Sequence, residues 1–488
     1  MKKIFIPFAL MAIVLLFAAV PFMPTSYGTL TEARVTNSGP SPVLPETPYE
    51  YRNPNLPSFL QDHGDQYNPV DNSITNAGAR LGRVLFYDTR LSKNLEISCA
   101  SCHDQSLAFT DSAKFSEGFD GELTTRQSMG LTNARMQPIQ RFFWDASADV
   151  LKDQVKLAVT SEVEMGMKFS EVIDRLQETD FYPGLFADAF GNANISEERI
   201  TAAIGQFVRS MIGKNSKFDL AAEAQGTTWP PFNDFTQIEN DGFNVFIENR
   251  CVNCHAVPHF ASFMPSNNGL NADNSEDQGL GGVTGNAWDM GLFKAPSLRN
   301  IELTAPYMHD GRFKTIEEVI EHYNSGIKDN PALSHELREW NGDNDPIKLD
   351  LTAYEKDALK AFLLTLTDPY FIKDPLYENP FEITEPKPAV ATPMDSLLNR
   401  KRFGNHSFFD LSVKAFPNPF TDFLQVELEN PDLLEIRLDL VDISGKVVFR
   451  TSGRESFYKI PREKLNAGNY VLRVKSDLHS WTQMVAVK

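Results

Sequence analysis

Cys99-Ala100-Ser101-Cys102-His103 and Cys251-Val252-Asn253-Cys254-His255 are two copies of one pattern, and they contain every cysteine of this chain. Two cysteines separated by two residues and followed at once by a histidine have the spacing that covalent haem attachment requires. Each thiol forms a thioether with one vinyl group of the porphyrin, and the adjacent histidine binds the iron. The sequence therefore predicts two covalently bound haem c groups, attached through Cys99, Cys102, Cys251 and Cys254, with His103 and His255 as iron ligands.

Other uses of the cysteines explain less of the pattern. A disulfide leaves the two adjacent histidines without a role. A zinc site needs four ligands, commonly from a second Cys or His pair nearby. A thioredoxin-like redox motif needs one such motif after a strand in a βαβ unit. Haem brings redox chemistry that side chains alone do not supply.

The N-terminus has the order of a secretory signal peptide. Lys2 and Lys3 precede an apolar run over residues 4–23, and a turn-prone stretch with small residues follows to Gly28. The apolar run is long, so an uncleaved membrane anchor is the alternative. Export agrees with haem attachment, which takes place outside the cytoplasm. We therefore expect an exported protein in the periplasm, at the cell surface or secreted through the outer membrane.

The charge of the chain limits its partners. Forty-six basic and 65 acidic residues give a net charge of −19. An acidic surface repels phosphate backbones, so no nucleic acid partner is expected. The same charge is able to steer a basic redox protein toward the surface, or it serves solubility alone.

The chain has 488 residues, enough for about three domains, and hydrophobic periodicity indicates how they are arranged. Period 3.6 predicts helices from Ala79, from Ser196 and after the capping boxes that begin at Thr315 and Thr352. Alternation from Leu424 to Glu429 and again from Ile436 predicts strands. The fold class expected is mainly α, with two cytochrome c-like haem domains followed by a small Ig-like β-sandwich. The expected segments are a signal peptide (1–28), an irregular arm (29–75), an N-terminal haem domain (76–220), a C-terminal haem domain (230–375), a linker (376–410) and the sandwich (411–488).

Segments around both haem motifs resemble the bacterial di-haem cytochrome c peroxidase family, which includes the enzyme that matures the tryptophan-derived cofactor of methylamine dehydrogenase. The resemblance covers roughly residues 70–370. It is carried by Leu81 to Asp88, Ile97 to His103, Phe142-Phe143-Trp144-Asp145, Val163-Glu164-Met165-Gly166, Lys294 to Asn300 and Leu303 to Gly311. It implies reduction of hydrogen peroxide to water at the N-terminal haem, with electrons relayed through the C-terminal haem from a cytochrome c or cupredoxin. A homodimer is compatible with it.

The tail resembles the C-terminal sorting domain of type IX secretion substrates. The matching segments are Phe416 to Phe420, Gly445-Lys446, Leu465 to Tyr470 and Val485 to Lys488. The resemblance implies that the type IX secretion machinery is a partner and that the domain is removed after export. The alternative is a sandwich that binds carbohydrate or another protein.

The peroxidase resemblance assigns roles at the first haem. Glu164 matches the distal acid that moves a proton between the two peroxide oxygens, and Glu162 is the fallback. Trp144 matches the tryptophan placed between the haems. Phe119 falls at or beside the position of a distal histidine, and phenylalanine does not bind iron, so we expect this haem to be open without reductive activation. Four methionines remain alternative ligands there: Met129, Met136, Met165 and Met167.

The second haem needs a sixth ligand to store an electron. Alignment from His309 places Tyr323 at the ligand position, as in the cofactor-maturing relative, with Met308 and then Met290 as alternatives. The family also holds a calcium ion, for which Thr304 and Pro306 match carbonyl ligands and Gln127 replaces the usual Asn. His309 matches a family position near the domain interface, and His259, His322 and His335 are expected to be structural or surface residues.

Three functions follow from these residues. The first is a cytochrome c peroxidase. The second keeps the peroxide chemistry but oxidises an organic or protein substrate through high-valent iron, which Tyr323 and Phe119 favour. The third is a non-enzymatic electron-transfer cytochrome, which Glu164 and the missing distal ligand oppose.

Overall fold

A computed structural model describes residues 39–488 except 53, 65–69, 139–140, 340–342, 390–391, 404–412, 417, 429–435, 443–445, 456, 476–479 and 488. The expected signal peptide (1–28) and the first ten residues of the expected arm lie outside the described residues. Within the part that is described, no helix has the length and apolar character needed to cross a membrane.

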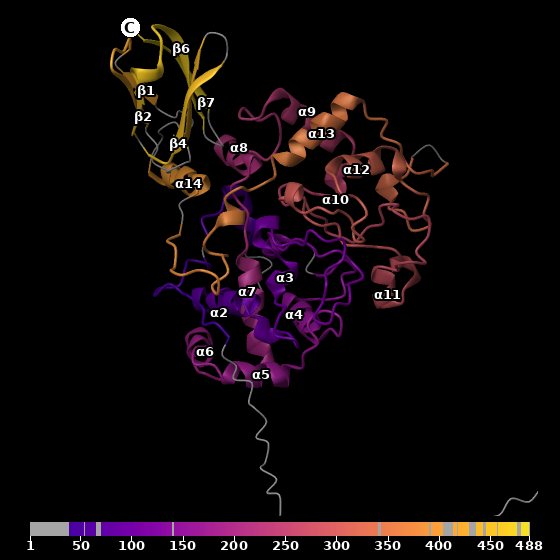
Figure 1. The fold of residues 1–488 in the computed structure, drawn as a ribbon. Coiled ribbons are helices and arrows are strands. Elements are labelled where there is room, and N and C mark those ends of the chain that lie inside the picture. The colour runs from indigo at the N-terminus through magenta and orange to yellow at the C-terminus, as the bar shows by residue number, and fades with distance from the viewer. Residues whose placement is uncertain are drawn as a thin grey trace, which may run out of the picture. The chain divides into compact units, whose positions relative to one another are not determined.

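Helices occupy the chain up to residue 403 and strands follow it, so the described protein is a mixture of helix and sheet (Figure 1). The helices are α1 (Ser58–Gly64), α2 (Asn76–Tyr87), α3 (Cys99–Cys102), α4 (Leu151–Thr160), α5 (Phe169–Gln177), α6 (Tyr182–Phe190), α7 (Glu197–Ser210), α8 (Lys217–Gln225), α9 (Gln237–Glu248), α10 (Cys251–Cys254), α11 (Leu280–Thr284), α12 (Ile316–Glu321), α13 (Ala353–Leu364) and α14 (Pro393–Phe403).

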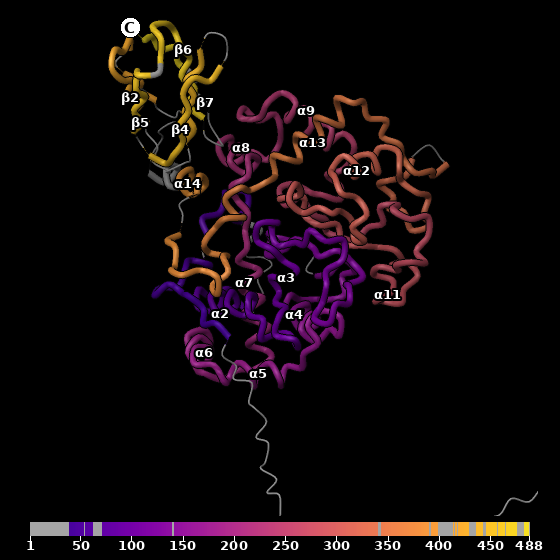
Figure 2. The backbone as a smooth tube through the Cα atoms, viewed as in Figure 1, coloured from indigo at the N-terminus to yellow at the C-terminus, as the bar shows by residue number. Residues whose placement is uncertain are grey.

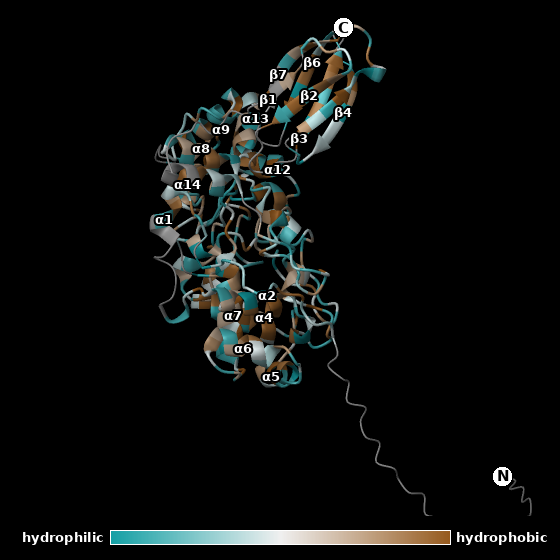
Figure 3. Ribbon diagram, turned by 90° about the vertical axis from the view of Figure 1, so that its left-hand side faces the viewer, coloured by the Kyte–Doolittle hydropathy of each residue, from teal (hydrophilic) through white to brown (hydrophobic). Residues whose placement is uncertain are grey.

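The first core is built on the pair α2 and α7. Thr75 and Ser196 cap these helices, because the side chain of each accepts a hydrogen bond from a backbone N–H of the first turn. A Cβ added to Gly82 would lie 1.9 Å from the carbonyl oxygen of Ala203, so only glycine lets the two helices approach this closely. Both helices bury apolar residues in one cluster with α4, α5 and α6, and Figure 3 shows hydrophobic residues along α2, α4 and α7.

The second core repeats this arrangement with α9 and α13. Capping boxes at Thr236 and Thr352 start both helices. A Cβ on Gly242 would lie 1.8 Å from the carbonyl oxygen of Ala358, the counterpart of the close approach at Gly82. In each core the first helix of the pair precedes a short helix that carries a Cys-x-x-Cys motif: α3 follows α2 after a 3-10 turn (Thr89–Leu91) and a loop, and α10 follows α9 within three residues.

Two segments lie outside the boundaries expected from sequence. Phe218, on α8, packs in the second core, although residues up to 220 were expected in the first domain. After α13 the chain returns to the first core, where Tyr87 Oη donates to the carbonyl oxygen of Tyr377 at 2.6 Å and Arg83 Nε donates to that of Glu378 at 2.7 Å. The orange segment beside α2 in Figure 2 is this return.

The tail forms two antiparallel sheets. Their strand orders are β1-β2-β5 and β4-β3-β6-β7, from β1 (Val413–Phe416), β2 (Phe423–Leu428), β3 (Ile436–Asp442), β4 (Val447–Gly453), β5 (Phe457–Pro461), β6 (Gly468–Lys475) and β7 (Ser480–Val487). Leu424, Val426 and Leu428 are buried and alternate with more exposed neighbours, as the period-two pattern predicts. Two sheets with one apolar core fit the expected Ig-like domain.

Candidate haem sites and the cluster between them

The first haem motif holds its histidine through a backbone carbonyl. His103 follows α3, and its Nδ1 lies 2.8 Å from the carbonyl oxygen of Phe109. Phe109 adopts φ 61°, which turns the chain back toward the histidine. Burial lowers the pKa of His103, so its imidazole is neutral and donates from Nδ1. This fixes the tautomer that leaves Nε2 available to a metal.

The second motif repeats this geometry. Nδ1 of His255 lies 3.2 Å from the carbonyl oxygens of both Phe260 and Pro296. Phe260 has φ 51°, the counterpart of Phe109. Burial lowers the pKa of His255 to about 4, so this imidazole is also neutral. A neutral histidine with an oriented Nε2, next to two cysteines, is the donor set that c-type haem needs.

A cavity of about 250 Å³ surrounds the second motif. Its wall includes Cys251, Cys254 and His255, and it is mostly apolar, with side chains from α9, α12 and α13. Because an apolar cavity with both cysteines and the histidine on its wall suits a porphyrin, the residues present fit the group that the motif predicts. Burial raises the pKa of Cys99 and of Cys102, and the nearby charge of Glu164 raises both further, so the acid lies close to the first motif.

Tyr323 and Met308 both line the cavity of the second motif. Tyr323 lies in a single π turn, His322–Gly326, directly after α12. Such turns are frequent at functional sites because they redirect one side chain out of the helical register. Asn268 contacts both candidates, since its Nδ2 lies 3.4 Å from Met308 Sδ and its side chain hydrogen-bonds Tyr323. Burial raises the pKa of Tyr323 to about 12.

Glu164 and Phe119 lie on two loops that are in contact. The N–H of Phe119 donates to the carbonyl oxygen of Glu164 at 3.0 Å, and Asn94 Nδ2 donates to that of Phe119 at 2.7 Å. The ring of Phe119 lies against Gly166, where an added Cβ would come within 2.5 Å of it. Burial raises the pKa of Glu164 to about 7. Glu162, the fallback acid, is exposed.

The methionines considered as ligands of the first haem have other surroundings. Met136, Met165 and Met167 are buried. Met165 and Met167 pack in the first apolar core. The backbone of Met129 hydrogen-bonds His103, which places it beside the expected proximal ligand.

Trp144 lies in a cluster that joins the two halves of the protein. Its Nε1 donates to the carbonyl oxygen of Gln127 at 2.7 Å, and its own carbonyl oxygen accepts from the N–H of Lys294 at 2.8 Å. The indole is edge-on to the ring of His309, with centroids 6.4 Å apart. His309 stacks on Phe293 at 3.8 Å. Trp144 is therefore held by both halves and lines the cavity of the second motif.

Arg126 supplies the positive charge beside Trp144, and sequence reasoning missed it. Ala146 and Ser147 follow Trp144-Asp145, so no basic residue stands directly after this pair in the sequence. In the structure Arg126 forms ion pairs with Asp145 at 2.5 Å and with Asp277 at 2.8 Å. Asp277 belongs to the second half, so the guanidinium links the two halves. No local pattern in the sequence pointed to Arg126, because its partners lie 19 and 151 residues away.

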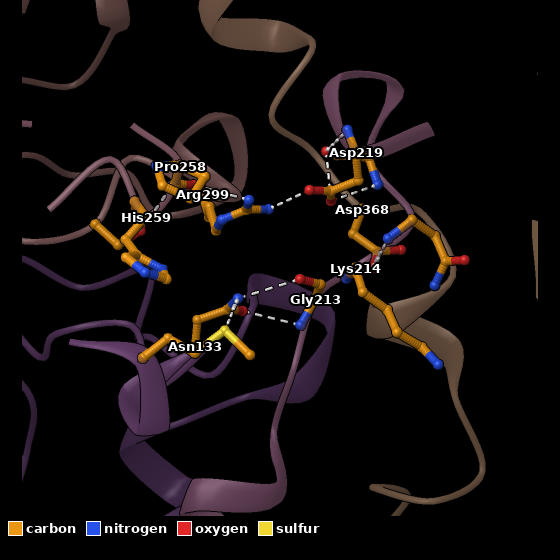
Figure 4. A network of polar contacts seen from close by, with 12 residues as sticks. Asn133, Gly213, Lys214, Asp219, Pro258, His259, Arg299 and Asp368 are labelled. Atoms are coloured by element: carbon orange, nitrogen blue, oxygen red, sulfur yellow. Dashed lines mark hydrogen bonds and ion pairs between the residues drawn. The ribbon is translucent and has the colours of Figure 1, made fainter. Parts of the chain in front are cut away.

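A buried polar network holds the loop that orients the histidine of the second motif (Figure 4). Arg299 and Asp219 form an ion pair at 2.7 Å, with side-chain exposures of 2% and 0%. Arg299 also donates to the carbonyl oxygen of Pro258 at 2.9 Å, and the N–H of Leu298 donates to that of Phe260 at 3.0 Å. These contacts fix the loop whose Phe260 carbonyl orients His255.

The calcium ion stays a prediction. Gln127, Thr304 and Pro306 do line one cavity. However, the backbone carbonyl oxygen of Gln127 already accepts a hydrogen bond from Trp144 Nε1. The side-chain Nε2 of Gln127 donates to Thr110 Oγ1 at 2.9 Å. In the described part of the chain, no group of three or more His, Cys, Asp or Glu side chains gathers to hold a metal. His259 and His322 are buried and His335 lies in a short 3-10 turn; their role as structural or surface residues stays a prediction.

Comparison with known proteins bears on both parts of the chain. Residues 76–227 match the family model of di-haem cytochrome c peroxidases, and residues 414–488 match that of the secretion system C-terminal sorting domain. The methylamine utilization protein MauG of Methylorubrum extorquens is 31% identical over 61% of this chain and 80% of its own. The cytochrome c551 peroxidase of Nitrosomonas europaea is 35% identical over 50% of this chain and 71% of its own.

A solved structure agrees with these matches. The crystal structure of a MauG-like protein associated with microbial copper homeostasis is 32% identical, with a TM-score of 0.59, over 68% of this chain and 99% of that one. The di-haem peroxidase BthA of Burkholderia thailandensis, at 20% identity and a TM-score of 0.52, shares the fold over 66% of this chain and 92% of its own.

Proposed function

The chain belongs to the di-haem cytochrome c peroxidase family, and from that premise we propose that it reduces hydrogen peroxide to water at the haem attached through Cys99 and Cys102. Electrons come from a small redox protein through the haem attached through Cys251 and Cys254. The bound haems supply the redox chemistry, and the side chains around them position the peroxide and move its protons. The sorting domain marks an exported protein, so the peroxide is met outside the cytoplasm.

Glu164 carries this proposal. Its carboxyl group is close to the first Cys pair and has a pKa raised to about 7 by burial. A carboxylate with such a pKa accepts a proton from the inner oxygen of hydrogen peroxide and returns it to the outer oxygen, which leaves as water. Phe119, on the adjoining loop, offers no atom that binds a metal, so we expect the position above the first motif to stay accessible.

The test compares Glu164→Gln with Glu162→Gln. Both substitutions remove one carboxylate from the same loop, but Glu162 is exposed. Because general acid–base catalysis contributes roughly 10²- to 10⁴-fold, E164Q should lower kcat/KM for peroxide by that factor while E162Q leaves it unchanged. Equal rates in E164Q and the unmodified protein, with both haems attached, would contradict the assignment.

Tyr323 favours a second function, oxidation of an organic or protein substrate. A tyrosine ligand would stabilise ferric iron at the second haem and disfavour storage of an electron there. The protein would then draw electrons from a substrate rather than from a dedicated donor. Peroxide consumption that needs no reduced redox protein but does need an oxidisable organic or protein substrate would support this function over the first.

A further inference from the structure

Lys294 is a buried cation in the cavity of the second haem motif. It is 6% exposed and lines the same cavity as Cys251, Cys254 and His255. Its Nζ lies 5.3 Å from the ring centroid of Phe142, and its N–H donates to the carbonyl oxygen of Trp144. The backbone of Lys294 is therefore tied to the segment between the two haem motifs, which fixes where its side chain starts.

The ammonium has no carboxylate partner among the described residues. The ion pairs of the described chain do not include Lys294, and burial alone lowers its pKa to about 8. An uncompensated charge inside a protein is strongly destabilising, so a buried lysine is retained where a ligand supplies the opposite charge.

The described lining of the cavity carries more positive than negative side chains. Three cationic side chains line it, Arg250, Lys294 and Arg299, against a single acidic residue of the described lining, Glu336. Asp219 already neutralises Arg299. The cavity therefore suits an anionic group on a bound molecule, and Lys294 is a buried cation available to meet it.

We propose that the ammonium of Lys294 binds a propionate carboxylate of the haem attached through Cys251 and Cys254. A porphyrin of this type carries two propionates, and the lysine presents a compact point charge to one of them. The contact lies next to Trp144, so it connects the anchoring of the second haem to the segment between the haems. The proposal depends on haem attachment at the second motif and is independent of peroxide reduction.

The test is the midpoint potential of each haem, measured by spectroelectrochemical titration of the complete di-haem protein. Lys294→Met removes a positive charge beside the second haem, which favours ferric iron. At a fixed potential the ferrous-to-ferric ratio of that haem should fall about tenfold, equivalent to 59 mV for one electron. Lys294→Arg should retain most of the potential. Lys328→Met removes one exposed charge from the same half and should change neither haem.

An unchanged second-haem potential in K294M, with both haems attached, overturns the proposal. An equal fall in K294R and K294M also overturns it, because a conserved charge would then have no effect. If K294M does not retain haem, resonance Raman bending modes of the propionates in K294R decide the matter. A shift in those modes supports the contact, and identical modes overturn it. These equilibrium readouts stand even if the protein proves inactive toward peroxide.

Discussion

The backbone N–H of Phe119 donates a 3.0 Å hydrogen bond to the carbonyl oxygen of Glu164. The loop that would carry a histidine ligand and the loop that carries the acid are thus held together. The ring of Phe119 lies against Gly166, and Lys93 Nζ lies 5.3 Å from its centroid. The two loops act as one unit beside the first haem motif.

Phe119→His should convert the protein to one that needs reduction before it reacts. An imidazole at this position is able to bind iron, whereas phenylalanine is not. We expect the ferric variant to show two low-spin haems by EPR and to lose its reaction with peroxide until it is reduced. Phe119→Leu is the control and should keep the original spectrum. A high-spin signal retained in F119H would show that residue 119 does not reach the iron.

Glu164 sets the pH dependence that we expect. Its pKa is raised to about 7, so its carboxyl is protonated below that pH and cannot accept a proton. The rate of the peroxide reaction should therefore rise as pH increases through about 7 and level off above it. Stopped-flow rates between pH 5 and 9 check this, a range on the order of two units either side of the pKa. In Glu164→Gln the profile should lose this step.

Tyr323 and Met308 are distinguished by removing each in turn. If Tyr323 is the sixth ligand, Tyr323→Phe will change the EPR and optical spectra of the second haem, because the phenol oxygen is lost. Met308→Leu should then leave those spectra as they are. The opposite pattern would assign Met308, whose sulfur lies 3.4 Å from Asn268 Nδ2.

Arg126 should contribute to stability as the link between the halves. Arg126→Met leaves the carboxylates of Asp145 and Asp277 without their partner, in positions 14% and 23% exposed. Loss of charged hydrogen bonds at partly buried sites should lower the free energy of unfolding by about 1–3 kcal/mol. Denaturant titration of the haem-loaded protein measures this change in the free energy of unfolding. Arg141→Met is the control, because its partner Asp149 is exposed and the loss should be small.

Gly82 should tolerate no side chain. In Gly82→Ala the new Cβ would lie 1.9 Å from the carbonyl oxygen of Ala203, so α2 and α7 must separate. Overpacking of this kind destabilises by about 1–3 kcal/mol or more. Gly184→Ala on α6 is the matched control, since nothing lies within 4 Å of the added Cβ. It should stabilise by about 0.5–1 kcal/mol through helix propensity.

Local patterns predicted most of the elements that position the sites. The capping boxes at Thr315 and Thr352 and the alternating strands from Leu424 appear as expected, because each depends on residues close in sequence. Arg126 was not predicted, since its two partners lie 19 and 151 residues away. The π turn at Tyr323 was also missed, because the apolar spacing around it is that of an ordinary helix.

The segments between the two cores meet at one buried aspartate. Asp368 Oδ2 accepts from the N–H groups of Lys214 and Asn215, at 2.8 and 2.9 Å, where the chain leaves α7 and where it returns after α13 (Figure 4). In sequence, residues 217–366 are thus inserted between two segments of the first core. Phe371 and Tyr377, which follow this insertion, complete that core. A chain that emerges N-terminus first from a membrane channel cannot complete its first core until its second core has already crossed.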